Sequence, residues 1–214
     1  GQEQQAEEMS FLGGALGIAV FLILLIIVAQ FNSYSTPTII LSAVVLSLIG
    51  VFLGLIISGS DFIIIMTMIG IISLAGVVVN NAIVLIDYTN LIRDRKKKEL
   101  GLSEEEWLPN KLVVQSIVEG GKTRLRPVLL TAITTVLGLL PLAVGLNIDF
   151  IGLITKYDAN IYIGGDNAMF FGPMSSTIIY GLTFATFLTL VVVPVMYYLL
   201  YRLKRNIYDK SEGY

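Results

Sequence analysis

The sequence contains no cysteine and no histidine among its 214 residues. The missing cysteines exclude disulfide bonds and thiol chemistry, and without both residue types a Cys/His metal site is excluded as well. The missing histidines remove the side chain that ordinarily titrates near neutral pH. Any proton chemistry in this chain therefore uses carboxylates, lysines, hydroxyl groups or water.

Charged residues are also scarce. They make up 14% of the chain, whereas 55% is hydrophobic, and the mean hydropathy is +0.81. This composition is too apolar for an ordinary soluble domain and predicts an all-α integral membrane protein with several spans. The net charge of −2 gives no indication of nucleic-acid binding, and we expect no partner of that class.

The motifs of soluble enzymes are missing too. The chain has no glycine-rich phosphate loop before a helix, no paired carboxylates outside loops and no nucleophile motif. We therefore expect that the protein is not an enzyme, and that it holds neither a cofactor nor a metal ion.

Apolar runs of membrane-spanning length recur along the chain and predict five transmembrane helices. Three lie within residues 11–90, at about 11–30, 38–58 and 62–88, and two lie within residues 126–201, at about 127–147 and 174–201. A periplasmic loop joins the last two, and Pro127 suits a first helical turn. Residues 1–10 before the first span are rich in Gln and Glu, lack a basic start and a cleavage site, and look like the cut end of a longer chain.

Residues 91–125 differ from the spans in kind. They carry a basic cluster from Arg93 to Lys98, followed by a run from Asn110 to Glu119 whose apolar residues fall mostly on one face. Gly120 and Gly121 are expected to end this run. We predict a short amphipathic helix along the membrane surface; a solvated helix packed on the bundle is the alternative.

The positive charges predict the orientation in the membrane. Nine of the 14 Lys and Arg residues lie between Arg93 and Arg126, and four lie in the tail, residues 202–214. The positive-inside rule places residues 91–125 and the tail in the cytoplasm, and residues 1–10 in the periplasm. Five spans satisfy this arrangement. The basic cluster is a topological anchor in contact with the lipid bilayer.

Polar side chains interrupt the third span at helical spacing. Ser73, Asn80 and Asp87 are seven residues apart, a step that returns to nearly the same face of a helix. Because unsatisfied polar groups are costly in lipid, we expect this stripe to face other helices or a wet cavity and to be functional. We expect the neighbouring amide, Asn81, to make hydrogen bonds between helices.

Small and hydroxyl side chains mark candidate packing faces. Gly50 and Gly54 in the second span form a GxxxG motif, which permits close helix approach. The fourth span has one narrow face of such residues, namely Thr131, Thr134, Thr135 and Gly138. Threonines in membrane helices most often serve as packing groups, so these residues are packing candidates. Ser73 in the third span is a further one.

Three stretches together form a recognisable pattern: residues 76–88 (GVVVNNAIVLIDY), residues 124–142 (RLRPVLLTAITT continuing to LGLLPL) and residues 183–194. This pattern resembles the inner-membrane pump of the resistance-nodulation-division (RND) family, the acriflavine-resistance type of multidrug exporter. The order of the stretches, the intervening cytoplasmic segment and the number of spans match. The resemblance covers essentially the whole chain, which aligns with the last five of the family's twelve transmembrane helices.

The resemblance implies the C-terminal half of an RND-type bundle in the bacterial inner membrane. Such pumps are homotrimeric antiporters driven by proton flow and coupled to a periplasmic adaptor and an outer-membrane channel. The N-terminal half of the same transporter carries paired aspartates in a membrane helix. By this resemblance the chain contributes half of the ion-coupling pathway for the export of drugs or other amphiphiles.

The family's proton relay also contains a threonine, an arginine and a lysine. Carried onto this sequence by resemblance, they fall on Thr131, Arg124 and Asn80. An amide at Asn80 can hydrogen-bond to a carboxyl group but cannot neutralise it. Coupling then uses sodium, a cation supplied elsewhere, or protonation alone. Asp87, near the cytoplasmic end of its span, fits either a proton exit or an interfacial anchor.

Two other functions fit the same residues. One is a non-transporting membrane scaffold or assembly protein, in which Asn80, Asn81 and the threonines are packing groups. The other is a relative in the same family that exports lipids or assists secretion.

Overall fold

Five long helices account for nearly all of the computed structural model, which describes residues 2–31, 35–60, 62–103, 106–149, 154–155 and 160–211. They are α1 (Gln2–Phe31), α2 (Ser35–Ser58), α3 (Ile64–Glu99), α4 (Asn110–Val144) and α6 (Asp166–Ser211). Each is long and apolar enough to cross a membrane, because its apolar run meets the roughly 20 residues that a bilayer requires. The prediction of five membrane-spanning helices is confirmed.

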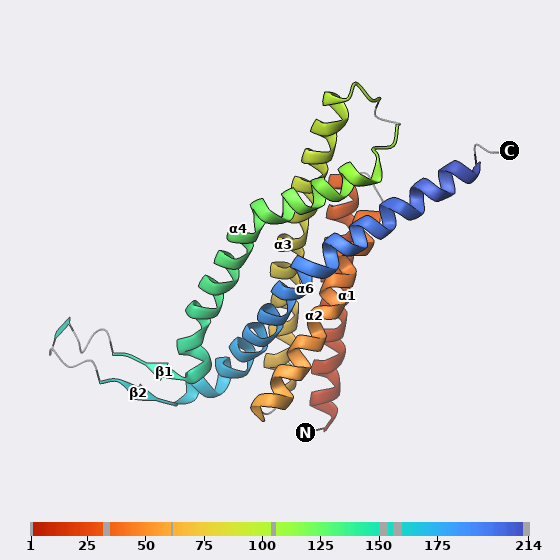
Figure 1. The fold of residues 1–214 in the computed structure, drawn as a ribbon. Coiled ribbons are helices and arrows are strands. Elements are labelled where there is room, and N and C mark those ends of the chain that lie inside the picture. Colours follow the sequence, from red (N-terminus) through yellow and green to blue (C-terminus); the bar gives the residue numbers. More distant parts are fainter. Residues whose placement is uncertain are drawn as a thin grey trace.

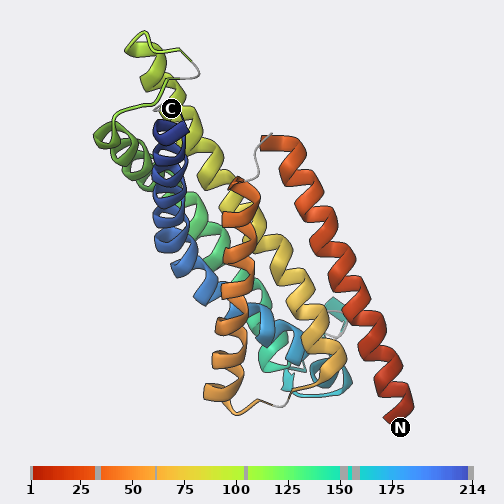
Figure 2. The same cartoon turned by 90° about the vertical axis from the view of Figure 1, so that its right-hand side faces the viewer.

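The last helix, α6, organises the bundle. It packs extensively against α2, α3 and α4, whereas α1 makes much smaller contacts, chiefly with α3 and α2. Figures 1 and 2 show α1 and α4 on different sides of α3. Fully buried side chains from three helices, including Val51, Leu74 and Val193, fill the space around α6.

Glycines let α6 approach its neighbours closely. A methyl group added at Gly50 or Gly54 of α2 would overlap the Phe184 or Tyr180 side chain of α6, respectively. On α6 itself, one added at Gly181 would overlap side chains of α2 and α3. Because lipid tails are as apolar as leucine, helix association in a membrane depends on such close packing. The GxxxG motif of α2 thus lies against α6.

Helix α3 extends well past its predicted end at about residue 88. It takes in the basic cluster and stops at Glu99, since Lys and Arg favour helices and complement the negative end of the helix dipole. Gly101 then adopts φ +68°, and its N–H bonds the Lys98 carbonyl while the Leu102 N–H bonds that of Lys97. This is a Schellman motif, which ends the helix.

The predicted end of the amphipathic helix at Gly120 and Gly121 is wrong. The segment is helical, but it continues without a break into the fourth span as α4. Gly120 is buried where α4 meets α3, and a Cβ added there would lie 2.8 Å from the Thr89 hydroxyl oxygen. This glycine therefore serves a helix–helix contact and does not terminate the helix.

A proline bends α4 without ending it. Pro127, expected in a first helical turn, lies inside the helix, and its missing N–H leaves the Thr123 carbonyl without its usual partner. Figure 1 shows the first part of α4 running at an angle to the rest. The predicted surface segment is the bent first part of a single long helix.

The connection between α4 and α6 contains a small antiparallel hairpin where only loop was expected. Its strands are β1 (Leu146–Asn147) and β2 (Tyr162–Ile163), paired as Leu146 with Ile163 and Asn147 with Tyr162. Gly145 ends α4 at φ +75°, a left-handed conformation that glycine adopts freely. The rest of this expected loop lies partly in residues 150–153 and 156–159, outside the described part of the chain, and α6 begins at Asp166, ahead of its predicted start.

An aromatic contact holds the start of α4 against the end of α6. The Tyr201 hydroxyl accepts a hydrogen bond from the Leu108 N–H at 2.9 Å and donates one to the Leu108 carbonyl at 3.2 Å. The Trp107 ring packs edge-on against Tyr201, with 5.1 Å between ring centroids. Leu108 is fully buried, so Tyr201 satisfies a backbone unit that water cannot reach.

Alanine at Gly54 or Gly50 should weaken the α2–α6 contact. The added methyl group overlaps an aromatic side chain, and overpacking of this kind costs about 1–3 kcal/mol. We expect a lower thermal unfolding temperature for the purified protein in detergent. Gly17→Ala is the control, because nothing lies within 4 Å of a Cβ at that position. Equal stability of all three variants would contradict the packing role.

Phenylalanine at Tyr201 should also destabilise the protein. Without the hydroxyl, both polar groups of the buried Leu108 peptide lose a partner, at a cost of roughly 1–3 kcal/mol. Thermal unfolding in detergent measures the loss, with Tyr198→Phe on the same helix as the control. If Tyr201→Phe unfolds at the same temperature as this control, the hydroxyl does not stabilise the connection.

Candidate functional site

One face of α3 carries polar side chains that none of the five described helices covers. Ser73, Asn80 and Asp87 are exposed, whereas residues on the opposite side, such as Leu74 and Val78, are buried in the bundle. The seven-residue spacing of the three polar residues places them on one face of the helix. The structure thus shows the predicted stripe on the outside of this five-helix unit.

The two adjacent amides separate onto different faces. Asn81 is only 6% exposed, inside the bundle, whereas Asn80 is exposed. Neighbouring residues on an α-helix differ by about 100° in direction, so such a split is expected. Asn80 can therefore contact a partner outside the described part of the chain, whereas Asn81 is buried among the helices of the bundle.

Hydroxyl groups line the corresponding part of α4. The Thr131 hydroxyl donates within its own helix, at 2.9 Å to the Val128 carbonyl and 3.1 Å to the Pro127 carbonyl. Thr134 and Thr135 likewise donate to carbonyls one turn earlier, at 2.8 and 2.7 Å. Each oxygen keeps lone pairs for a further donor. Thr131 and Thr134 are exposed, and so is Gly138, where nothing lies within 4 Å of an added Cβ.

A cation–π contact joins α3 to α4 at one end of these faces. The Arg124 guanidinium carbon lies 4.4 Å from the centroid of the Tyr88 ring. Tyr88 directly follows Asp87, and Arg124 precedes Thr131 by seven residues, or nearly two turns. The Arg124 Nε is buried and makes no hydrogen bond with the described residues. The ring of Tyr88 therefore fixes the position of this positive charge.

The main residues of the candidate site are Asn80 and Asp87 on α3 and Arg124 and Thr131 on α4, and the contact of Arg124 with Tyr88 links the two helices. An amide, a hydroxyl and a guanidinium supply donors and one positive charge, but Asn80 cannot carry charge itself. No group of three or more metal-ligating side chains occurs in the part of the chain that the structure describes. The arrangement is suited to binding carboxyl groups presented by another membrane segment.

Burial costs support that assignment. Polar side chains exposed to hydrocarbon are unfavourable, so membrane proteins turn them towards other helices or a wet cavity. The five helices leave Asn80 and Thr131 uncovered. Further protein or water must therefore lie against this face in the membrane. Whether Ser73, Thr134, Thr135 and Gly138 pack against such a helix stays a prediction, as do the roles of the other site residues.

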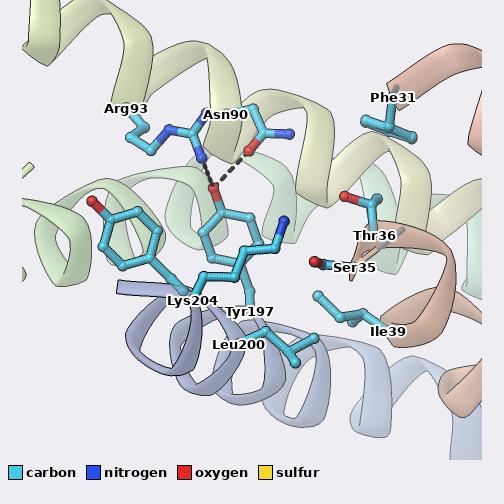
Figure 3. A pocket seen from close by; sticks show the side chains of 10 residues that line it. Phe31, Ser35, Thr36, Ile39, Asn90, Arg93, Tyr197, Leu200 and Lys204 are labelled. Carbon is cyan, nitrogen blue, oxygen red and sulfur yellow. Dashed lines mark hydrogen bonds between the residues drawn. The ribbon is translucent and has the colours of Figure 1, made fainter. Parts of the chain in front are cut away.

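The structure also reveals a second polar cluster that the sequence reasoning missed. The Tyr197 hydroxyl donates to the Asn90 side-chain oxygen at 2.6 Å and accepts from Arg93 Nη1 at 3.0 Å (Figure 3). These residues come from α3 and α6, more than 100 positions apart in the sequence. An aromatic residue with a polar tip at the end of a long apolar run is the one available signal.

Comparison with known proteins identifies relatives of this chain. Residues 1–149 match the model of the AcrB/AcrD/AcrF family. The chain is 35% identical over 201 residues to the swarming motility protein SwrC of Bacillus subtilis, covering 94% of the chain and 16% of SwrC. It is 28% identical over 188 residues to the multidrug resistance protein MdtC of Erwinia tasmaniensis, covering 88% of the chain and 15% of MdtC.

A solved structure agrees with these matches. The crystal structure of a heavy metal efflux pump superposes with a TM-score of 0.68 at 28% sequence identity, covering 92% of the chain and 16% of the pump. The chain thus spans about one sixth of the length of these relatives.

Leucine at Tyr88 should release Arg124. A cation–π contact of this kind is worth about 0.5–1 kcal/mol where it is partly exposed, so Tyr88→Leu should lower the free energy of unfolding by that amount and Tyr88→Phe should not. In a double-mutant cycle with Arg124→Gln, the two effects should not add, because the residues share one interaction. Additive effects, measured by unfolding in detergent, would show that the ring and the guanidinium act independently.

Proposed function

Because the chain belongs to the AcrB/AcrD/AcrF family of RND efflux transporters, of which it is a membrane portion, we propose that it contributes half of the ion-coupling pathway of a pump that exports drugs or other amphiphiles. The observation that carries this proposal is the uncovered polar face of α3 and α4. A set of amide, hydroxyl and guanidinium groups at membrane depth is costly unless it serves a partner.

The proposed partner is the other half of the same transporter, with paired carboxyl groups in a membrane helix. Asn80 suits either protonation state of a carboxyl, since its NH₂ donates to a carboxylate and its oxygen accepts from a protonated acid. The Thr131 hydroxyl already donates to its own helix, and its oxygen can accept a hydrogen bond from a protonated acid or a water molecule. Together, Asn80 and Thr131 can hydrogen-bond to the carboxyl pair in both its protonated and its ionised form.

Charge compensation has to come from elsewhere, because Asn80 stays neutral. We propose that protonation itself switches the carboxyl pair, since each proton removes a charge that is costly to hold in the membrane. Arg124, held on Tyr88 at 4.4 Å, supplies the positive charge near one end of the path. Asp87, which is exposed and precedes Tyr88 in the sequence, provides an exit towards water.

We propose the bacterial inner membrane as the location, with the N-terminal segment in the periplasm and the C-terminus in the cytoplasm. The basic residues support this orientation, as they gather in α3, the first part of α4 and the end of α6. A homotrimer working with a periplasmic adaptor and an outer-membrane channel is the assembly that we propose for the whole pump.

The relatives also support a second candidate. The Bacillus subtilis relative is named for swarming motility and not for the export of a drug. Export of a lipid or a secreted amphiphile, or a scaffold role without transport, is therefore the alternative. In the scaffold case Asn80, Asn81 and the threonines act only in packing.

Efflux by cells that express the full-length transporter tests the coupling role. Asn80→Ala and Thr131→Ala should each reduce ion-driven drug efflux about tenfold or more, because a hydrogen bond to a charged group is worth roughly 1.5–3 kcal/mol. Thr131→Ser keeps the hydroxyl and should retain efflux. Ile133→Ala, at an exposed apolar position on the same helix, is the matched control.

Protein levels in the membrane must be equal for these comparisons. Full efflux by Asn80→Ala and Thr131→Ala would show that neither residue is needed for coupling and would leave both with a packing role. Wild-type cells that export no drug at all would favour the alternative function.

A further inference from the structure

A cavity of about 250 Å³ lies where the end of α1 and the start of α2 meet α3 and α6 (Figure 3). Its lining includes the polar side chains of Ser35, Thr36, Asn90, Arg93, Tyr197 and Lys204, with Tyr201 beside them. Phe31, Ile39 and Leu200 provide apolar lining. We call this cavity the interfacial pocket. It is separate from the polar face of α3 and α4, and the proposed coupling mechanism does not use it.

The charge of the interfacial pocket is positive. Arg93 and Lys204 are its charged lining residues, and no acidic side chain lines it in the described part of the chain. Asp94, the neighbour of Arg93 on α3, pairs with the guanidinium at 3.0 Å and offsets part of that charge. Lys204 has no ion pair within the described residues and is exposed. The pocket therefore favours an anion.

Hydrogen bonds hold Arg93 in place while leaving donors for a ligand. Nη1 donates to the Tyr197 hydroxyl at 3.0 Å, and Nε and Nη2 donate to Asp94 at 3.2 and 3.0 Å. A guanidinium has five N–H donors, so two remain. Figure 3 shows the Lys204 side chain extending into the space between Tyr197 and the first turn of α2. Two basic groups from different helices thus converge on one cavity.

The pocket lies at the level of the membrane surface. Helix α2 has 24 residues, which span about 36 Å at 1.5 Å per residue, slightly more than the roughly 30 Å of hydrocarbon in a bilayer. Its first turn, at Ser35 and Thr36, therefore reaches the headgroup region. On α6 the uncharged stretch 167–201 ends just before Lys204. The start of α2 adds the positive end of a helix dipole to the same place.

We propose that the interfacial pocket binds the phosphate group of an anionic phospholipid from the cytoplasmic leaflet. Arg93 and Lys204 bind the phosphate oxygens, Asn90 and Thr36 lie within the polar lining that the glycerol region enters, and Phe31 and Leu200 contact the start of an acyl chain. Basic pockets between membrane helices on the cytoplasmic side suit such headgroups. This inference rests on the orientation given under the proposed function.

A lipid in this position would connect three parts of the bundle. Helix α1 is, together with α4, the helix with the least burial in the described part of the chain. A phosphate held by α3 and α6 beside the start of α2 joins these elements at their shared end. The apolar lining, with Phe31, Ile39 and Leu200, and the position at the membrane surface favour a lipid phosphate over a phosphate ion free in water.

Lipid binding to the full-length transporter tests the proposal. The protein is purified in neutral detergent and titrated with dioleoylphosphatidylglycerol, dioleoylphosphatidylcholine or inorganic phosphate, and bound lipid is counted by native mass spectrometry. We expect phosphatidylglycerol to bind at least about tenfold more tightly than phosphatidylcholine. Lys204→Gln should weaken phosphatidylglycerol binding about fivefold, the effect of one basic residue near an anionic surface.

Arg202→Gln is the matched control, because Arg202 is an exposed basic residue on α6 that does not line the pocket. It should leave the affinity unchanged. Arg93→Gln should weaken binding more than Lys204→Gln; because Arg93 also bonds Tyr197, Lys204→Gln decides the result if that variant misfolds. Equal binding of both lipids, or equal effects of Lys204→Gln and Arg202→Gln, would overturn the proposal. Competition by inorganic phosphate as strong as that by phosphatidylglycerol would show a site for free anions and overturn it too.

The lipid test is independent of transport. It needs no export substrate, so a loss of efflux in Asn80→Ala with intact phosphatidylglycerol binding concerns only the coupling pathway. Normal wild-type efflux with no preference for phosphatidylglycerol would reject only the lipid site.

Discussion

Close contact between α6 and its neighbours is the constraint on which the rest of the structure depends. In a membrane, helices gain little by hiding apolar side chains from lipid, so association relies on packing at short range. Gly50, Gly54 and Gly181 allow the helices to approach this closely, since a methyl group at any of them would overlap a neighbouring side chain. With α6 held against α2 and α3, the polar face of α3 is turned to the outside. The position of Asn80 thus follows from glycines on other faces of the bundle.

Helix α3 is packed against the bundle on one side and carries exposed polar side chains on the other. Leu74 and Val78 of α3 are buried, while Asn80 on the same helix is exposed. A stable lipid-facing surface would have apolar residues there. This asymmetry motivates the proposal that another part of the transporter covers the polar face, and the relatives are about six times as long as this chain.

Hydropathy was sufficient to predict the five spans, because crossing a bilayer imposes a length and an apolar composition that can be counted along the sequence. Helical periodicity likewise grouped Ser73, Asn80 and Asp87 on one face. Predictions from local sequence were wrong where a contact with a residue far away in the sequence determined the structure. Gly120 resembled a helix end until its contact with Thr89 was visible. The contacts of Arg124 with Tyr88 and of Tyr197 with Asn90 join separate helices, and one sequence carries no signal for such pairs.

The continuity of α4 has a mechanical consequence. Its hydrogen-bonded backbone runs from the first part, beside the Leu108–Tyr201 contact, through the bend near Pro127 to the threonines within the membrane. A rod of this kind cannot shorten to absorb a displacement. A small rotation of the threonine-bearing part must therefore appear as a sweep of the arm beyond the bend, or as strain on the tyrosine that ties down its base. The continuous backbone of α4 would thus couple a rotation within the membrane to a displacement of the segment before Pro127.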